Sequence, residues 1–252
     1  MSGESQHPFT VLNTTQSRYS AMVGANSALP LLAYIQQQHL PRIILLYSAH
    51  QSVPAHYVAS ILETQLTHVD IVFLKTRTPA STSLTFLNHA LDCATSTTQA
   101  LDYYNQIASS SISGTLTRSL FHKADHGFNV PTLLKSLVFR KHVILNGPPQ
   151  QIQSASQVLA SVDPSRVTLT YYTHDSALPA AYRQFIQSFP NSRQLPAVAE
   201  HNQRNTTLEF FIVGPEPLKL RQPIAQCPRC HHALYSEYCP ICHTRPHPRR
   251  RS

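Results

Sequence analysis

Four cysteines near the end of the chain constrain its folding more than any other feature of the sequence. Two residues separate Cys227 from Cys230, two separate Cys239 from Cys242, and eight lie between the pairs. Each pair can turn both thiolates toward one metal ion, and two facing pairs supply the tetrahedral set that Zn²⁺ accepts. Because so short a segment has little apolar surface to bury, its folding must be coupled to metal binding. The sequence therefore predicts a structural zinc site.

Other uses of these cysteines remain open at this stage. An iron–sulfur cluster also takes four thiolates, and a single C-x-x-C can be a redox pair, although that leaves the second pair unexplained. His231, His232 or His243 could replace a cysteine as ligand. A catalytic zinc site keeps one position open for water, whereas four cysteines close the coordination sphere. The metal is therefore expected to hold structure and to do no chemistry.

The positive charge of the chain is concentrated at its C-terminal end. The net charge is +8, and residues 219–252 hold seven Lys and Arg residues against Glu237 alone, which leaves the first 218 residues nearly neutral. A basic end attracts polyanions such as DNA. The candidate contact residues are Arg229, Arg245, Arg249, Arg250 and Arg251. The alternative is that this end is only a solvated tail.

Apolar runs of strand length recur along the rest of the chain. Such continuous runs are typical of strands that are covered on both faces. The expected strands are 9–12, 42–47, 69–74, 142–145, 167–172 and 208–213. Amphipathic segments between them predict helices, with Val53, Tyr57, Ile61, Leu62 and Leu66 sharing one helix face and Leu178, Tyr182, Phe185, Ile186 and Phe189 sharing another. Residues 95–130 give no clear pattern, and 109–113 resemble a loop.

This alternation of strands and helices predicts an α/β fold with an open, mostly parallel sheet and helices on both faces. We expect the α/β domain to span residues 1–218, the zinc module 219–244 and a basic disordered tail 245–252. No run of about 18 apolar residues is present for a membrane span. Residues 1–8 have neither the basic start nor the apolar stretch of a signal peptide, so we expect that the chain is not secreted. The cysteine pattern fits a reducing compartment, the cytosol or the nucleus.

The α/β part lacks the usual catalytic motifs. It contains no P-loop, no G-x-G-x-x-G and no G-x-S-x-G sequence. Cys93 lies within a helical apolar pattern, so a small buried hydrophobic residue is the preferred interpretation and a reactive thiol the alternative. We therefore expect no enzymatic activity, although a nucleotide- or phosphate-using enzyme with an unrecognised motif stays open as a third hypothesis.

One polar segment follows the first expected strand. Asn13, Thr15 and Ser17 form an N-x-T-x-S pattern at a position where open α/β sheets bind ligands. The pattern resembles the D-x-S-x-S metal-adhesion motif of von Willebrand factor A domains, with the first acid replaced. Loss of that carboxylate removes the main charge that holds a divalent cation. The segment is therefore expected to be a degenerate metal site, or simply a polar turn at the start of a helix.

The order of these features resembles a known family, the smaller von Willebrand A-type subunit of the transcription and repair factor TFIIH. The segments HVILN, VTLTYY, IQSFPNSRQLP, LEFFIV and CPRC…CPIC occur in the family's order. The resemblance implies a von Willebrand A-like three-layer open sheet with a C-terminal zinc ribbon. It also implies a nuclear, non-enzymatic scaffold for transcription initiation and nucleotide excision repair, paired with a second von Willebrand A-type subunit. The alternative function is a freestanding zinc-ribbon protein that binds nucleic acid.

Overall fold

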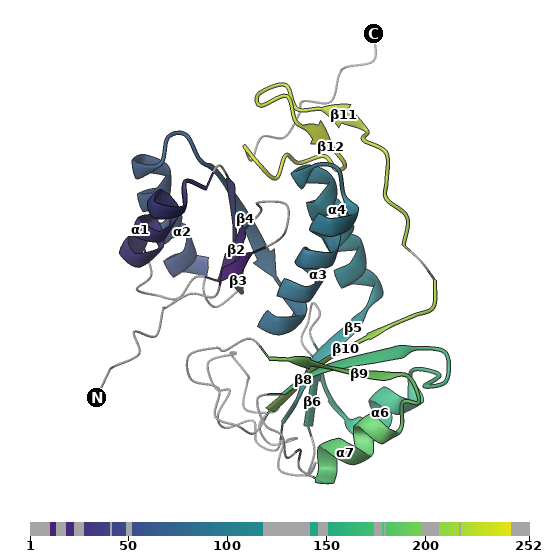
Figure 1. Cartoon of the computed structure of the whole chain (residues 1–252). Coiled ribbons are helices and arrows are strands. Elements are labelled where there is room, and N and C mark those ends of the chain that lie inside the picture. The colour runs from purple at the N-terminus through teal and green to yellow at the C-terminus, as the bar shows by residue number, and fades with distance from the viewer. Residues whose placement is uncertain are drawn as a thin grey trace, which may run out of the picture. The chain divides into compact units, whose positions relative to one another are not determined.

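The structure is a computed structural model that describes residues 11–13, 19–22, 28–40, 42–48, 52–117, 142–145, 151–173, 178, 180–197, 207–216 and 218–242 (Figure 1). The chain divides into two compact units. The first unit contains Met1–Thr76, Leu84–Ile107 and Leu218–Ser252, and the second contains Arg77–Ser83 and Ala108–Pro217. Each unit is built around its own sheet, so the chain folds into two α/β bodies.

The sheet of the first unit has four strands in the order β1-β2-β3-β4. These are β1 (Val11–Asn13), β2 (Tyr19–Met22), β3 (Arg42–Ser48) and β4 (Asp70–Thr76). β1 pairs antiparallel with β2, whereas β2, β3 and β4 are parallel. The parallel pairs are joined by crossover helices, α1 (Ala28–Gln38) and α2 (Ser52–Gln65), as parallel pairing requires.

Both faces of β3 and β4 are buried. One face packs against α1 and α2 through a cluster that includes Leu31, Ile35, Ile43, Leu62 and Ile71. The residues between these positions on the strands, Ile44, Leu46, Val72 and Leu74, are buried as well. Figure 1 shows α3 (Ala80–Cys93) and α4 (Thr97–Ser110) on that opposite side. This double coverage explains why both strands are continuous apolar runs.

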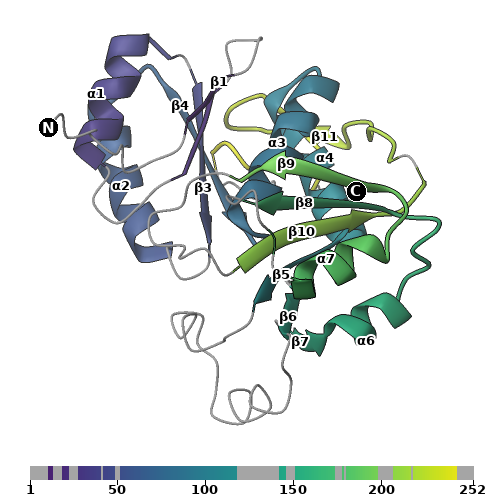
Figure 2. The ribbon, with the colours of Figure 1, turned by 60° about the horizontal axis from the view of Figure 1, so that its bottom comes forward.

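The sheet of the second unit has six strands in the order β7-β6-β5-β10-β8-β9 (Figure 2). The strands are β5 (Ile112–Thr117), β6 (His142–Leu145), β7 (Gln151–Ser154), β8 (Thr168–Thr173), β9 (Ser192–Pro196) and β10 (Thr207–Val213). Only β8 and β9 are parallel in this sheet, and the other neighbours are antiparallel. The last strand, β10, therefore lies at the centre of the sheet.

Two helices cover one face of this sheet, α6 (Ala155–Ala160) and α7 (Ala180–Gln187). A capping box between Ser154 and Gln157 starts α6. The ring of Phe185 on α7 lies 5.4 Å from that of Phe189 and 5.3 Å from that of Phe210 on β10, both in edge-to-face geometry. These aromatic contacts form the centre of the core beneath the sheet.

The C-terminal segment returns to the first unit and ends in a small hairpin. β11 (Ala225–Gln226) pairs antiparallel with β12 (Ala233–Leu234). The buried residues of this segment are Cys227, Leu234 and Cys239. Two of the three are cysteines of the predicted zinc site, so apolar burial in this segment is minimal.

The structure confirms an α/β fold with mixed sheets, and it corrects the expected arrangement. A single von Willebrand A-like, three-layer, mostly parallel sheet is wrong, because the strands divide between two sheets and the second sheet is mainly antiparallel. Continuous apolar runs indicate coverage of both faces but do not specify strand direction. The boundaries 1–218, 219–244 and 245–252 remain a prediction.

Several local expectations also change. Residues 95–130 contain α4 and β5, so 109–113 is the end of a helix and the start of a strand. Tyr57 is exposed, and the buried face of α2 is formed by Ala55, Val58, Leu62 and Leu66. Of the face predicted for α7, Tyr182, Phe185, Ile186 and Phe189 are buried as expected, whereas Leu178 lies before the helix and is partly buried. Among the described residues, none of the helices combines the length and apolar character required to cross a membrane.

Candidate functional site

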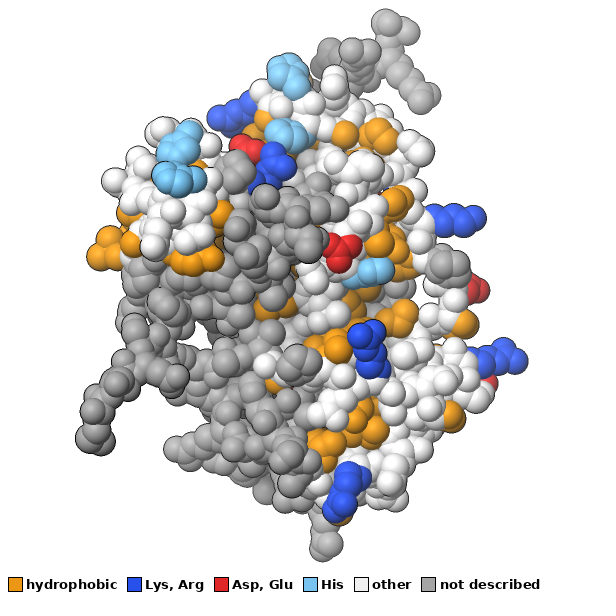
Figure 3. Space-filling view, in the orientation of Figure 1, with side chains coloured by type: hydrophobic (Ala, Val, Ile, Leu, Met, Phe, Trp, Pro, Cys, Tyr) orange, Lys and Arg blue, Asp and Glu red, His pale blue; other side chains and the backbone are white. Residues whose placement is uncertain are grey.

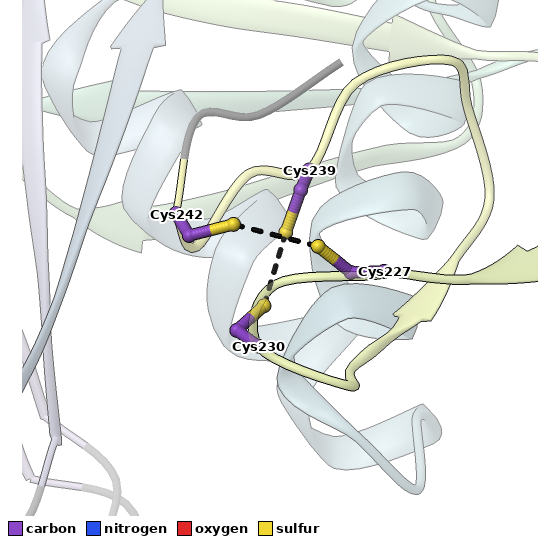
Figure 4. A group of neighbouring side chains, drawn as sticks. All are labelled: Cys227, Cys230, Cys239 and Cys242. Atoms are coloured by element: carbon purple, nitrogen blue, oxygen red, sulfur yellow. Dashed lines mark hydrogen bonds between the residues drawn. The ribbon is translucent and has the colours of Figure 1, made fainter. Parts of the chain in front are cut away.

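The four cysteines of the C-terminal segment converge on one point. Their sulfur atoms all lie within 4.8 Å of one another, and Figure 4 shows the four side chains pointing inward. The Sγ atoms of Cys227 and Cys242 are 3.4 Å apart, and those of Cys230 and Cys239 are 3.5 Å apart. A disulfide bond requires about 2.05 Å, whereas tetrahedral ligation at a Zn–S distance of about 2.3 Å places sulfurs about 3.8 Å apart. The spacing therefore fits a shared metal ion.

The backbone of the first cysteine pair is arranged for this convergence. His231 N–H donates to the carbonyl of Cys227 at 3.0 Å, and Cys227 N–H donates to the carbonyl of His232 at 2.9 Å. His231 has φ = 59°, the left-handed conformation that reverses the chain after Cys230. This reversal brings the segment back as β12, whose Leu234 carbonyl accepts from Ile224 N–H at 2.8 Å.

Two of the four thiols, those of Cys230 and Cys239, are in an environment that favours their neutral form unless a cation is present. Burial raises the pKa of Cys230 to about 12, and burial also raises the pKa of Cys239. Metal ligation requires the thiolate, so positive charge at the centre of the cluster is needed to deprotonate the set. The four cysteines thus lie within metal-binding distance, while zinc itself remains a prediction.

The linker before this cluster contacts α4 in the first unit. The carbonyl of Leu218 accepts from Tyr103 Oη, and the carbonyl of Arg221 accepts from Gln99 Nε2, both at 3.5 Å. The Arg221 guanidinium lies 3.6 Å from the carboxylate of Asp102. These contacts, to Gln99, Asp102 and Tyr103 of α4, hold the chain where it enters the cysteine module.

A second candidate site lies on the sheet of the second unit, on the face opposite α6 and α7. Directly opposed residues of antiparallel strands share a face, and the register places Glu209 of β10 opposite Thr115 of β5, with Phe211 opposite both Ser113 of β5 and Thr170 of β8. All five residues are buried. This face is therefore polar at its centre, in contrast to the wholly apolar face that packs on α6 and α7.

The N-terminus of α3 belongs to the same unit and meets this polar face. Ser81 N–H, in the first turn of α3, donates to Oε2 of Glu209 at 3.1 Å. The first turn of α3 has no acidic residue of its own. A carboxylate at a helix N-terminus is stabilised by the unpaired amides and the helix dipole. Glu209, which is 6% exposed, supplies that charge from the neighbouring strand.

Hydroxyl groups surround this helix start. Thr78 and Ser83 hydrogen-bond to each other through their side chains at 2.6 Å. By contrast, the hydroxyls of Thr82 and Ser113 have no hydrogen-bond partner among the described residues, although Thr82 is 0% exposed. An unpaired buried hydroxyl costs about 1–3 kcal/mol. Thr82 directly follows Ser81 in α3, and Ser113 lies two residues along β5 from Thr115, the residue opposite Glu209.

Sequence reasoning missed this second site. A threonine followed by a proline shortly after a strand is a helix-start signal, and Thr78-Pro79 carries that signal. Glu209 is the one charged residue within the apolar run of β10. Only the pairing of β10 with β5 and the position of α3 show that these two signals coincide.

The other predicted site residues do not form a second cluster within the described residues. Asn13 ends β1 and pairs with Tyr19 in an antiparallel hairpin, while Thr15 and Ser17 lie outside the described residues, so the degenerate metal site stays a prediction. Cys93 is exposed, which corrects its expected burial, and its Sγ lies 3.8 Å from Nδ1 of His89. 

The structure does not test the predicted polyanion contact, because most of its residues lie outside the described part of the chain. Arg229 is exposed, and Arg245, Arg249, Arg250, Arg251 and His243 lie outside the described residues. On the face shown in Figure 3, lysine and arginine side chains are scattered singly and do not gather into a patch.

Comparison with solved structures identifies the architecture. A DegV family protein from Corynebacterium glutamicum matches with a TM-score of 0.57 and 9% identity, covering 84% of this chain and 89% of that protein. The chain has a DegV-like fold. A DegV family protein from Eubacterium eligens, loaded with heptadecanoic acid, matches with a TM-score of 0.54 and 7% identity, over 82% of this chain and 92% of that one.

A third match is the DegV family protein from Thermus thermophilus, whose structure concerns fatty acid binding, with a TM-score of 0.55, 9% identity and coverage of 78% of this chain and 79% of that one. At these identities the comparison shows the fold alone. No protein-family model matches the sequence, and no curated protein does.

These matches overturn the resemblance to the TFIIH subunit. The scaffold function in transcription and repair is wrong, as are the partner subunit, the DNA contact and the nuclear localisation that followed from it, because the similar structures are bacterial DegV family proteins. The alternative of a freestanding zinc-ribbon protein that binds nucleic acid is likewise unsupported. The resemblance depended on the order of short apolar segments before a cysteine pair, and that order is compatible with both folds.

Proposed function

We propose that this chain is a non-enzymatic binding protein for a lipid with a long acyl chain, and that the lipid's polar head lies at the start of α3. One observation carries the proposal. Thr82 and Ser113 have buried hydroxyls without partners among the described residues, beside the helix start that already holds Glu209. A bound head group would satisfy them by hydrogen bonds alone, which requires no catalytic residue.

The fold supports the acyl part of the ligand. The similar protein from Eubacterium eligens holds heptadecanoic acid, and that from Thermus thermophilus is a fatty acid-binding protein. A shared fold does not by itself carry a function. The proposal therefore joins the fold to the polar face of β5, β8 and β10, which this chain builds from its own residues.

The test uses the purified full chain. Organic extraction followed by mass spectrometry should recover an acyl lipid in about stoichiometric amount, and a fluorescent acyl probe should bind the delipidated protein. Thr82→Val keeps the side-chain volume and removes the hydroxyl. Loss of one hydrogen bond worth about 1 kcal/mol should weaken lipid binding about five-fold.

A matched control is Thr64→Val, at an exposed position of α2. This variant should bind the lipid as the wild type does. Thr82→Val should also leave the lipid-free protein at least as stable as before, because the removed hydroxyl had no partner there. If no lipid is recovered and no acyl probe binds, the proposal is refuted.

We further propose that the four-cysteine cluster holds one structural Zn²⁺ within a module spanning residues 219–244. The closed set of four thiolates fits zinc and leaves no position for a substrate. Elemental analysis of the purified chain should find one zinc per chain. An iron–sulfur cluster would instead show iron and visible absorption, and either finding would exclude zinc as the resident metal.

A further inference from the structure

We propose that hydrogen peroxide converts the cysteine cluster into two disulfide bonds, Cys227–Cys242 and Cys230–Cys239, which hold the module closed in place of the metal ion. This inference rests on the structural zinc site proposed above and names the way in which that site is regulated. Four cysteines can pair in three ways, and the main alternative joins the two cysteines within each C-x-x-C sequence. The two pairings have opposite consequences, because only the first connects the two halves of the module.

The first argument is the distance between the sulfur atoms. The Sγ atoms of Cys227 and Cys242 are 3.4 Å apart, and those of Cys230 and Cys239 are 3.5 Å apart. Both contacts cross from one C-x-x-C sequence to the other (Figure 4). Each is shorter than the separation of about 3.8 Å between sulfurs that share one zinc ion. The two crossing bonds would therefore form between sulfurs that are already in contact.

The second argument is the access of an oxidant to these pairs. Cys227 and Cys239 are buried, whereas Cys230 and Cys242 are half-buried. Peroxide from solvent therefore reaches Cys230 and Cys242 first, and a sulfenic acid formed there condenses with a nearby thiol to a disulfide. Each half-buried sulfur has a buried crossing partner in contact with it. The C-x-x-C pairs also join a buried and a half-buried cysteine, so access starts the reaction and distance selects the pairing.

The chemical step balances for each disulfide. The sulfur of Cys230 bonds to one oxygen of the peroxide, the O–O bond breaks, and the other oxygen leaves as water. The sulfur of Cys239 then attacks the sulfenic sulfur, so that the S–S bond forms, the S–O bond breaks and a second water leaves. Two sulfurs lose two electrons, and the two protons come from the thiols or, where the sulfurs are thiolates, from solvent. The disulfide sulfurs no longer carry the negative charge that metal ligation requires.

The pairing decides whether the oxidised module stays folded. Cys230 precedes β12, whereas Cys239 and Cys242 follow it, so crossing bonds connect the two sides of the hairpin. Their sequence separations are 15 and 9 residues, whereas a C-x-x-C bond joins cysteines with only two residues between them. A disulfide restricts the unfolded chain more when it closes a longer loop. The crossing bonds are therefore expected to keep the hairpin closed without metal.

The experiment uses the purified full chain with Cys93→Ser, which leaves the four cysteines of the cluster as the remaining thiols of the chain. Two equivalents of hydrogen peroxide should lower the zinc content from one ion per chain to none and leave no thiol open to alkylation. In hydrogen–deuterium exchange, the amides of Ile224 and Cys227, which donate within the hairpin, should stay protected in the oxidised chain. Chelation without oxidation should remove this protection.

The pairing is read from peptides of the oxidised, alkylated chain. Cleavage after Arg229 and after Glu237 places Cys227 on one peptide, Cys230 on a second, and Cys239 with the last cysteine on a third. Crossing bonds should join all three peptides, and tandem mass spectrometry should find the second peptide attached through Cys239. Bonds within the C-x-x-C sequences would instead leave the third peptide separate.

The matched control is the same chain oxidised in denaturant with a chelator, where loop closure favours the nearest cysteines and hence the C-x-x-C pairs. Several results for the folded chain would overturn the proposal while the zinc site stands: bonds within the C-x-x-C sequences, sulfinic acids without disulfides, or loss of protection at the hairpin amides. If the purified chain holds no zinc, the zinc site is wrong, and the pairing found after oxidation still decides whether the folded cluster forms crossing bonds.

Discussion

Removal of one cysteine from the cluster should unfold the C-terminal module while the rest of the chain stays folded. The segment from Cys227 to Cys242 buries one apolar side chain that is not a cysteine, Leu234. Burial of a leucine contributes about 1.5–3 kcal/mol, whereas ordering the backbone costs about 1–2 kcal/mol per residue. One leucine thus offsets the ordering of about two residues, and the remainder depends on the metal, whose binding supplies about 10–16 kcal/mol in comparable small sites.

The variant for this test is Cys239→Ser, measured by hydrogen–deuterium exchange and by zinc content. The amides of Ile224 and Cys227 donate to carbonyls of the hairpin in the folded module. In Cys239→Ser both amides should lose protection from exchange, and the chain should no longer hold zinc at one ion per chain. Addition of a chelator to the wild type should produce the same change.

Cys93→Ser is the matched control, because Cys93 is exposed and lies outside the cluster. It should keep one zinc per chain and full protection of the hairpin amides. Unchanged protection of these amides in Cys239→Ser, or in chelated wild type, would refute the reasoning that metal binding and folding of the module are coupled.

Three further predictions concern the body of the chain. Phe185→Ala should lower the free energy of unfolding of the second unit by about 3–5 kcal/mol in chemical denaturation, because the Phe185 ring is buried between the rings of Phe189 and Phe210. The control Gln187→Ala, at an exposed position, should change this free energy by less than about 0.5 kcal/mol. Burial raises the pKa of Tyr47, so its neutral phenol stabilises the fold below the ordinary tyrosine pKa of about 10 and this stability is lost as pH rises through the folded pKa. Tyr47→Phe should flatten that alkaline decline in thermal unfolding, and an identical decline would contradict the assignment. Asp70→Asn should lower the free energy of unfolding by at most about 1 kcal/mol, because the 2.6 Å ion pair with Arg42 is partly exposed. The difference in free energy from the wild type should shrink at high salt. A difference that persists at high salt would show that the pair is not screened.

The elements of the fold were largely predictable from sequence, and their arrangement was not. The apolar runs at 42–47, 142–145 and 208–213 all become strands, because continuous β-branched and aromatic residues favour extended backbone. α4 was missed, although Leu101, Tyr104 and Ile107 recur at helical spacing, because polar residues between them dilute the pattern. Which strands pair, and in which direction, depends on contacts far apart in sequence.

The candidate sites differ in the same way. The two cysteine pairs lie within sixteen residues, so local chain geometry is enough to bring their sulfurs together and the motif was visible in the sequence. Glu209 and Ser81 are 128 residues apart, and nothing local links them. The TFIIH resemblance failed for this reason, since it relied on the order of segments and order does not fix strand pairing.

The sequence by itself determined that this chain is α/β and that it carries four cysteines at metal-ligand spacing. Both properties follow from periodicity and spacing within short stretches. Only the tertiary structure decided that the strands form two sheets, that β10 is central in the second, and that a buried carboxylate meets the start of α3. These depend on long-range pairing, whose free energy comes from burial and hydrogen bonds that exist only once distant segments are packed together.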